Sequence, residues 1–101
     1  MNEATFAAQI EYLLDLGGWR WCHYEPAVRQ SGRWATPLRG SKGSPDYHAV
    51  RSGRLIFIEL KGDGGRVSRD QGAWIADLLE AGVETYLWKP EDLIIAQEIL
   101  R

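Results

Sequence analysis

The sequence contains little cysteine, little histidine and no long apolar run, and each scarcity excludes a class of protein. One cysteine and two histidines among 101 residues leave no internal disulfide and no cysteine-rich zinc site. Cys22 alternates with its neighbours as in a strand, which favours a buried structural thiol. No apolar run approaches the ~20 residues of a membrane-spanning helix. The N-terminus is acidic where a signal peptide would be basic, so we expect a cytoplasmic protein.

The chain also has no excess of basic residues. Its formal net charge is −2, which gives no global sign of nucleic-acid binding. The 45% hydrophobic and 26% charged residues are typical of a soluble globular protein. A chain of 101 residues can build one core but not two, so we expect a single domain over residues 1–101.

The first half of the chain predicts one helix and three strands. Apolar residues at helical spacing predict a helix over Glu3–Leu16, followed by an aromatic-rich strand over Trp19–Tyr24. Scattered glycine, proline and serine predict a long loop over Glu25–Ser44. The segments DYHAV and RLIFIELK, joined by Arg51-Ser52-Gly53, predict a β-hairpin.

The second half predicts a helix, a strand and a final helix. Ser68 is a candidate N-cap for a helix from about Arg69 to Ala81. The strand VETYLW follows, and Pro90 begins a short helix through Leu100. A strand-helix-strand order favours a parallel right-handed crossover. We therefore expect an α/β fold with a mixed four-stranded sheet flanked by helices, in the order α-β-β-β-α-β plus a C-terminal helix.

The stretch LIFIELKG is apolar at its start and charged at its end. Both of its alternating faces begin apolar, which favours a central strand that is covered on each side. Antiparallel pairing around the hairpin brings Asp46 opposite roughly Glu59 to Lys61. An ion pair at the rim of the sheet is one interpretation. Two converging carboxylates and a lysine are also the ingredients of Mg²⁺-assisted attack on a phosphodiester.

The motif order points to a known family. GSPDYHAVRSGRLIFIELKG resembles the PD-(D/E)XK nuclease signature, with Pro45-Asp46 followed by Glu59-Leu60-Lys61. Within that superfamily the chain resembles the VRR-NUC nucleases, relatives of the Holliday junction resolvases. The likeness continues through the block GRVSRDQGAWIADLLEAGVETYLWKPEDL. The resemblance implies a restriction-endonuclease-like core.

The resemblance also implies roles for the charged residues. Asp46 and Glu59 are expected to hold Mg²⁺ or Mn²⁺, with the backbone carbonyl of Leu60 as a further ligand. Lys61 is expected to orient or activate the attacking water, or to stabilise charge on the phosphate. Because a free lysine has a pKa of about 10.4, we favour the electrostatic role over proton abstraction.

Four further residues near the expected site each have a functional and a structural interpretation. Gln71 is expected beside the active site as a catalytic residue, or as a capping-box residue alone. Glu3 is a further metal or water ligand, or a solvated acid in the first helical turn. Glu11 is a lesser candidate for the same role and is interpreted as a surface residue. His48 is interpreted as a half-buried, hydrogen-bonded histidine, and the alternative is a contact with DNA or the site.

Basic residues surround the expected site along the sequence. We expect phosphate contacts from Arg29, Arg33, Arg39, Lys42, Arg66 and Arg69. The alternative is a solvated, charged loop. The tryptophans at 19, 21, 74 and 88 are interpreted as packing residues.

The sequence thus predicts a Mg²⁺- or Mn²⁺-dependent deoxyribonuclease. By resemblance, it is a homodimer that acts on branched DNA such as four-way junctions, or on double-stranded DNA. One alternative is a restriction-type or flap endonuclease. The other is a non-catalytic DNA-binding module with the same fold, against which the intact Asp46, Glu59 and Lys61 argue.

Overall fold

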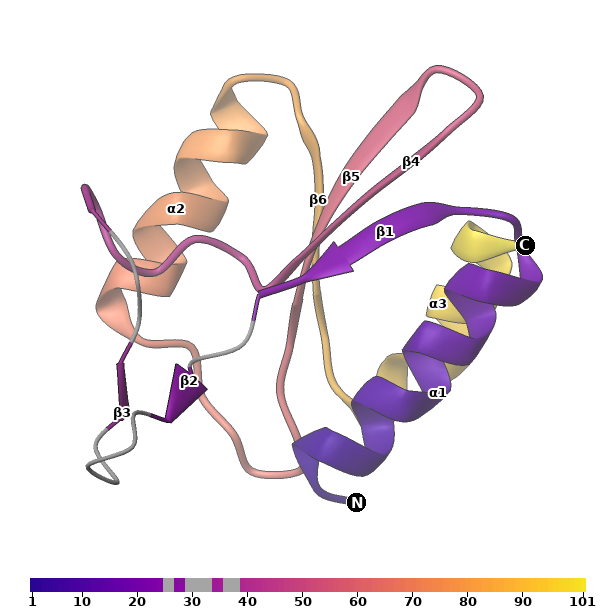
Figure 1. Cartoon of the computed structure of the whole chain (residues 1–101), viewed down its shortest axis with the longest axis horizontal. Coiled ribbons are helices and arrows are strands. Elements are labelled where there is room, and N and C mark those ends of the chain that lie inside the picture. The colour runs from indigo at the N-terminus through magenta and orange to yellow at the C-terminus, as the bar shows by residue number, and fades with distance from the viewer. Residues whose placement is uncertain (25–26, 29–33, 36–38) are drawn as a thin grey trace.

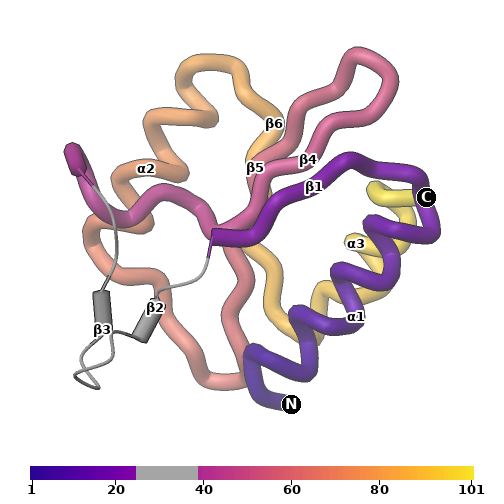
Figure 2. Tube along the Cα trace, in the orientation of Figure 1, coloured from indigo at the N-terminus to yellow at the C-terminus, as the bar shows by residue number. Residues whose placement is uncertain are grey.

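The chain folds into a mixed four-stranded sheet between helices, as expected (Figure 1). The structure is a computed structural model that describes residues 1–24, 27–28, 34–35 and 39–101, and Figure 2 traces its path. The elements are, in order, α1 (Glu3–Leu16), β1 (Arg20–His23), β2 (Ala27–Val28), β3 (Trp34–Ala35), β4 (Tyr47–Arg51), β5 (Arg54–Leu60), α2 (Arg69–Glu80), β6 (Glu84–Trp88), a 3₁₀ turn (Pro90–Asp92) and α3 (Leu93–Leu100).

Helix α1 forms because it has a capped start and one apolar face. The side chain of Asn2 accepts a hydrogen bond from the Thr5 backbone N–H at 2.8 Å, which satisfies a donor that the first turn leaves unpaired. Phe6, Ile10 and Leu14 recur at helical spacing and are buried. The helix ends one residue before Gly17, where the sequence predicts.

The hairpin of β4 and β5 forms the centre of the sheet, whose strand order is β1-β4-β5-β6. Its register pairs Tyr47 with Ile58 and Arg51 with Arg54. The turn residues Ser52 and Gly53 have φ angles of 49° and 81°, the left-handed pair that matches the twist of a tight hairpin. Strand β6 joins β5 in parallel, which confirms the predicted parallel pairing.

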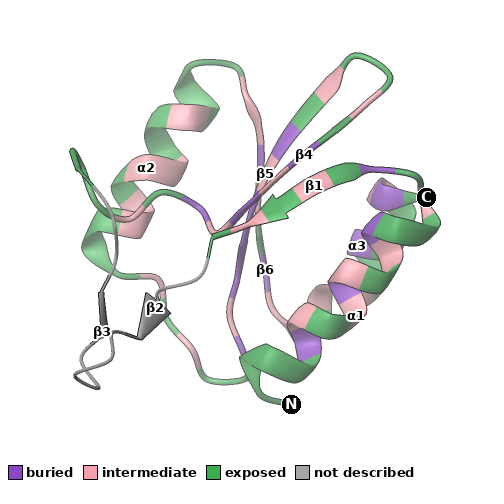
Figure 3. Cartoon of the chain, in the orientation of Figure 1, coloured by how far each residue is buried: buried purple, intermediate pink, exposed green. Residues whose placement is uncertain are grey.

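The helices cover the two faces of the sheet unequally. Helices α1 and α3 lie together on one face, and α2 lies on the other (Figure 1). The buried core consists of Phe6, Ile10, Leu14, Trp19, Tyr47, Ala49, Ile56, Ile58, Leu60, Trp88, Ala96 and Leu100, and it fills the first face (Figure 3). Leu55 is 45% exposed on the other face. The expectation that β5 is covered on each side is therefore wrong at its start.

Two other sequence expectations differ from the structure. The loop predicted over Glu25–Ser44 contains β2 and β3, which pair antiparallel as a separate two-stranded sheet. Cys22 is exposed, so its predicted burial is wrong. It pairs with His48 and lies on the sheet face opposite α1, where α2 packs against β6 and leaves β1 open. Within the described residues, no helix is long and apolar enough to cross a membrane.

Candidate active site

The hairpin register places the two expected carboxylates side by side. Because Tyr47 pairs with Ile58, Asp46 stands opposite Glu59, one residue before β4 begins. The Asp46 backbone carbonyl accepts a hydrogen bond from the Tyr24 backbone N–H at 2.8 Å, which joins the end of β1 to this edge. Asp46 is half-buried and Glu59 is only 1% exposed. The structure therefore brings Asp46 and Glu59 together at one end of the hairpin, as the sequence predicts.

Glu59 is a buried carboxylate with one satisfied and one unsatisfied oxygen. Its Oε2 accepts a hydrogen bond from Gln71 Nε2 at 3.3 Å and lies 3.9 Å from Lys61 Nζ. Its Oε1 is buried with no hydrogen-bond partner among the described residues. Such a group costs free energy until a ligand satisfies it.

The same environment changes the acidity of Glu59. Burial, followed by the negative charge and close contact of Asp46, raises the pKa of Glu59 from 4.5 to about 8. The charge of Lys61 opposes this shift but does not cancel it. A buried carboxylate whose proton affinity is raised by a neighbouring carboxylate is a site for a cation.

Gln71 forms the predicted capping box and also lies beside Glu59. Its side-chain oxygen accepts from the Ser68 backbone N–H at 2.9 Å, and its own backbone N–H donates to Ser68 Oγ at 3.1 Å. This capping box fixes the amide, whose Nε2 then reaches Glu59. The start of α2 is thereby joined to the end of β5.

Glu3 reaches the site because the first turn of α1 packs against Gly62. A Cβ at Gly62 would lie 2.6 Å from the Glu3 backbone nitrogen, so only glycine permits this approach. Glu3 itself is exposed, and its charge contributes to the raised pKa of Glu59. It therefore lies near the carboxylates without being buried with them.

An open pocket of about 900 Å³ lies beside these residues. Its lining consists of Glu3, Ala4, Ala7, Ala8, Glu11, His23, Tyr24, Asp46, Lys61 and Gln71. Sequence reasoning gave Glu11 only as a lesser candidate and assigned no role at this site to His23. The signal for Glu11 was its spacing of eight residues from Glu3, which puts both acids on one side of the helix. His23 had no such signal, since only the pairing of β1 with β4 brings it to the site.

Glu11 is not the plain surface residue that the sequence suggested. Its Oε2 accepts a hydrogen bond from the Tyr47 hydroxyl and lies 3.6 Å from His23 Nδ1. His48 is half-buried as expected, and its ring contacts those of Tyr24 and Phe57. It is not among the residues that line the pocket.

The segment that leads into Asp46 is attached to α2. Trp74 Nε1 lies 3.3 Å from the Ser41 carbonyl oxygen and 3.1 Å from that of Lys42, and donates to both. Gly43 has a φ of 99°, and a Cβ there would lie 2.7 Å from the Asp70 backbone. Trp74 and Gly43 thus hold this approach segment close to the helix that carries Gln71.

The expected DNA contacts fall in two groups. Arg29 and Arg33 lie outside the described residues. The other four are exposed along the approach segment and the start of α2: Arg39, Lys42, Arg66 and Arg69. Lys42 lies 3.6 Å from Asp70, an exposed pair that solvent screens strongly.

The donor set suits a hard cation. Asp46 and Glu59 supply carboxylate oxygens, and the unsatisfied Glu59 Oε1 is an oxygen that needs a partner. No group of three or more acidic, histidine or cysteine side chains within the described ranges is arranged to hold a metal ion. Mg²⁺ commonly uses one or two carboxylates and completes its shell with water and phosphate oxygens. The residues therefore fit Mg²⁺ or Mn²⁺ better than zinc, which prefers imidazole and thiolate.

A mixed sheet with paired carboxylates and a lysine at the end of its hairpin is the arrangement of a PD-(D/E)XK nuclease domain. A sequence profile of the VRR-NUC domain matches residues 33–89, more than half of the chain. The protein therefore belongs to the VRR-NUC family, a family of nuclease domains that act on DNA. Neither the curated proteins nor the solved structures contain a significant match to this chain.

Proposed function

We propose that this protein is a Mg²⁺- or Mn²⁺-dependent endonuclease that hydrolyses DNA phosphodiester bonds, with branched DNA as its preferred substrate. The observation that carries the proposal is the buried, unsatisfied Oε1 of Glu59 beside Asp46. A nuclease needs a cation at this position, whereas a DNA-binding module has no use for a buried pair of repelling carboxylates.

In this proposal Asp46, Glu59 and the Leu60 carbonyl hold the cation, with Glu3 as a neighbouring acid. The bound cation would polarise the phosphoryl oxygen and make a bound water more acidic. The chain's own residues position the reactants around it. Gln71 holds the second oxygen of Glu59 in place, and only one of the two carboxylate oxygens remains to bind the ion.

Lys61 acts on the substrate in this scheme. Its side chain is 16% exposed and lies 3.9 Å from Glu59 Oε2, so the ammonium is tethered at the mouth of the pocket. From there it donates a hydrogen bond to a phosphate oxygen and stabilises the charge that develops during attack. Its position beside Glu59 Oε2 supports the electrostatic role over that of a general base.

The exposed basic residues would bind the DNA backbone. Arg39 and Lys42 precede Asp46 on the approach segment, while Arg66 and Arg69 flank the start of α2. Because Trp74 joins these two regions, their positive charges border the same side of the site. Arg29 and Arg33 extend this group in the sequence. A two-fold dimer would present two such sites to two strands.

The test compares cleavage of labelled linear duplex, flap and four-way-junction DNA with Mg²⁺ or Mn²⁺. Asp46→Ala and Lys61→Ala are measured beside the wild type, and mass in solution is measured by light scattering. Symmetric nicks at the junction that need Asp46 and Lys61 are the expected result. Cleavage of flap alone would replace the junction preference with a flap nuclease. Binding without any metal-dependent cleavage would favour the non-catalytic module.

A further inference from the structure

Tyr24 is an exposed aromatic residue at the edge of the active-site pocket. It directly follows β1 and lines the pocket together with Asp46 and Lys61. It is 59% exposed. An exposed ring is ordinary by itself, but this one borders the place where the proposed reaction occurs. It is therefore a candidate contact for the substrate.

Both the backbone and the ring of Tyr24 are held by the sheet. Its backbone N–H donates to the Asp46 carbonyl at 2.8 Å. Its ring lies against His48 with 5.4 Å between ring centroids and 34° between ring planes, and His48 in turn contacts Phe57 on β5 at 6.1 Å. A ring that is already positioned in this way loses less freedom when a second flat group stacks on it.

The charge of the pocket decides which part of a DNA strand suits this ring. Among the described lining residues are the carboxylates of Glu3, Glu11 and Asp46, against one ammonium, that of Lys61. The described basic residues of the approach segment and of the start of α2 do not line the pocket. Beyond the phosphate that the cation and Lys61 would bind, this acidic wall repels a further phosphate but accepts an uncharged nucleobase.

The pocket also has room for such a base. Its α1 side carries three alanines between the two acids, Ala4, Ala7 and Ala8, and each of these side chains is a single methyl group. The volume of about 900 Å³ is at the upper end of the roughly 300–1,000 Å³ of ligand sites. One nucleoside therefore fits beside the phosphate that is hydrolysed.

We propose that Tyr24 stacks on an unpaired nucleobase next to the hydrolysed phosphate and thereby selects branched DNA over continuous duplex. The inference rests on the proposed nuclease function of the same pocket. In a continuous duplex the bases stack on one another, and removing one from the stack costs free energy, whereas a base that is already unpaired costs the least. Tyr24 then determines which DNA structure binds, and Lys61 and the cation act on its phosphate.

The competing role is structural, in which Tyr24 only covers His48. Tyr24→Leu separates the two roles, because leucine keeps an apolar side chain against His48 and removes the aromatic ring. Tyr24→Phe keeps the ring and removes only the hydroxyl. Tyr12→Leu is the matched control, since Tyr12 is a similarly exposed tyrosine, at 65%, that does not line the pocket.

The experiment measures the dissociation constants of fluorescein-labelled four-way-junction DNA and fully paired duplex by anisotropy, with Ca²⁺ in place of Mg²⁺ to prevent cleavage. Tyr24→Leu is expected to weaken junction binding about tenfold, the loss for one base–aromatic stack, and to change duplex binding less than about twofold. Tyr24→Phe and Tyr12→Leu are expected to bind both DNAs within about twofold of wild type. Unchanged junction affinity in Tyr24→Leu, an equal loss on both DNAs, or an equal loss in Tyr24→Phe or Tyr12→Leu overturns the proposal.

A second measurement does not depend on how the variants fold. The wild-type protein is irradiated with junction DNA that carries 5-iododeoxyuridine, placed in turn at each nucleotide next to the branch point. This base forms a covalent bond to an aromatic side chain that it contacts, and mass spectrometry identifies the residue. A bond to Tyr24 supports the proposal, and bonds only to other residues, or none, overturn it.

Cleavage with Mg²⁺ then separates this inference from the proposed function. Absence of cleavage by the wild type, combined with junction binding that depends on the Tyr24 ring, rejects the nuclease and retains the contact. Cleavage of the junction with the same KM in wild type and Tyr24→Leu rejects the contact and retains the nuclease.

Discussion

Glu59 and Glu84 lie on neighbouring parallel strands, at opposite ends of the sheet, and their environments move their pKa values in opposite directions. Burial and Asp46 raise the pKa of Glu59 to about 8. The hydrogen bonds from Arg54 lower the pKa of Glu84 below its ordinary value. One carboxylate is left short of partners, and the other is fully paired.

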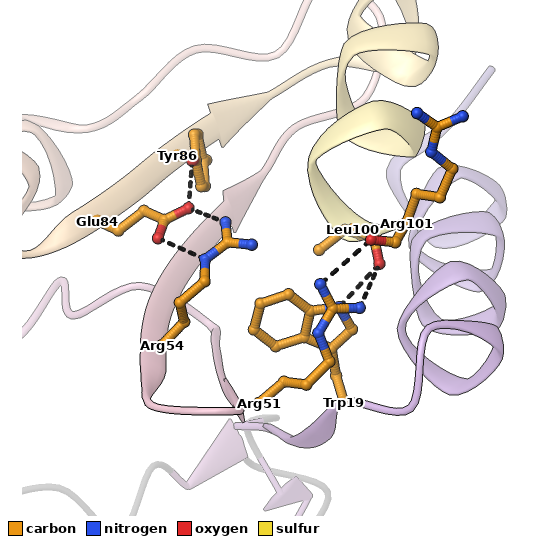
Figure 4. Close-up of polar contacts among 7 residues, drawn as sticks. All are labelled: Trp19, Arg51, Arg54, Glu84, Tyr86, Leu100 and Arg101. Atoms are coloured by element: carbon orange, nitrogen blue, oxygen red, sulfur yellow. Dashed lines mark hydrogen bonds and ion pairs between the residues drawn. The ribbon is translucent and has the colours of Figure 1, made fainter.

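At the Glu84 end of the sheet, here called the paired end, side chains of the same chain satisfy the carboxylate. Arg54 Nε lies 3.2 Å from Glu84 Oε1 and Arg54 Nη2 lies 2.5 Å from Oε2, so the guanidinium donates to both carboxylate oxygens, and Tyr86 donates its hydroxyl to Oε2 (Figure 4). The bond to Glu84 raises the pKa of Arg54. Burial and Glu84 raise that of Tyr86 to about 12.

Arg51 completes this end by joining the hairpin to the helices. Its Nη1 donates to the carbonyl oxygens of Gly17 at 2.9 Å and Leu100 at 3.2 Å. Its guanidinium carbon lies 4.3 Å from the centroid of the Trp19 ring (Figure 4). Trp19 Nε1 in turn donates to Leu100. One end of the sheet therefore satisfies its charges within the fold, while the other holds a buried carboxylate oxygen with no hydrogen-bond partner among the described residues.

The largest expected effect comes from removing charge at the active-site end. Asp46→Asn should lower the rate of metal-dependent cleavage on the order of 10²–10³-fold, since an amide is a poor ligand for a hard cation. Above about pH 8, where Glu59 is ionised, its melting temperature should not fall, because the substitution relieves repulsion with Glu59. Initial rates on labelled DNA and thermal unfolding measure both. A variant that cleaves like wild type would remove Asp46 from the site.

Glu59→Gln should change how the stability of the metal-free protein depends on pH. The folded chain holds the Glu59 proton up to about pH 8, whereas the unfolded chain loses it near pH 4.5. The metal-free folded state therefore binds more protons in this window, and its stability falls as pH rises through it. At pH 9, Glu59→Gln should be more stable by about 2 kcal/mol and melt roughly 8–16 °C higher.

Metal addition provides the control for this prediction. Mg²⁺ should stabilise the wild type at pH 9, where Glu59 is ionised, and should have little effect on Glu59→Gln. Thermal unfolding from pH 5 to pH 9, with Mg²⁺ and with chelator, measures the difference. Parallel pH curves for the two proteins would contradict the raised pKa.

At the paired end, Arg51→Met should reduce stability without affecting chemistry. Methionine keeps much of the side-chain volume but removes the donors to Gly17 and Leu100 and the contact with Trp19. We expect a loss of about 1–2 kcal/mol in the free energy of unfolding, measured by urea denaturation. The cleavage rate at saturating DNA should stay within about twofold, and a large drop would show that the two ends are coupled.

The smallest effect is expected at Glu84. Glu84→Gln keeps the side-chain shape and removes one charge from a pair whose partner Arg54 is 41% exposed. Solvent screens such pairs, so the loss should be below about 1 kcal/mol. Urea denaturation at low and high salt would measure it. A loss that exceeds that of Arg51→Met would show that the pair is worth more than its exposure suggests.

Much of the fold could be predicted because its signals are local. The bounds of α1 follow from helical periodicity and Gly17, and the hairpin follows from alternation around Ser52-Gly53. Cys22 was predicted wrongly because burial depends on which strand has a helix above it. The short β2–β3 pair carries too few residues for a period to show.

The sequence by itself determined the elements of the site: Asp46, Glu59 and Lys61 in hairpin order, with a capped helix after them. Alternation and capping act between residues close in the chain, so the sequence displays them. Only the tertiary structure decided that Glu59 Oε1 would be left unsatisfied, that Gln71 would both cap and contact Glu59, and that His23 would border the pocket. These depend on groups from distant elements that meet in one place, and burial and charge act through space.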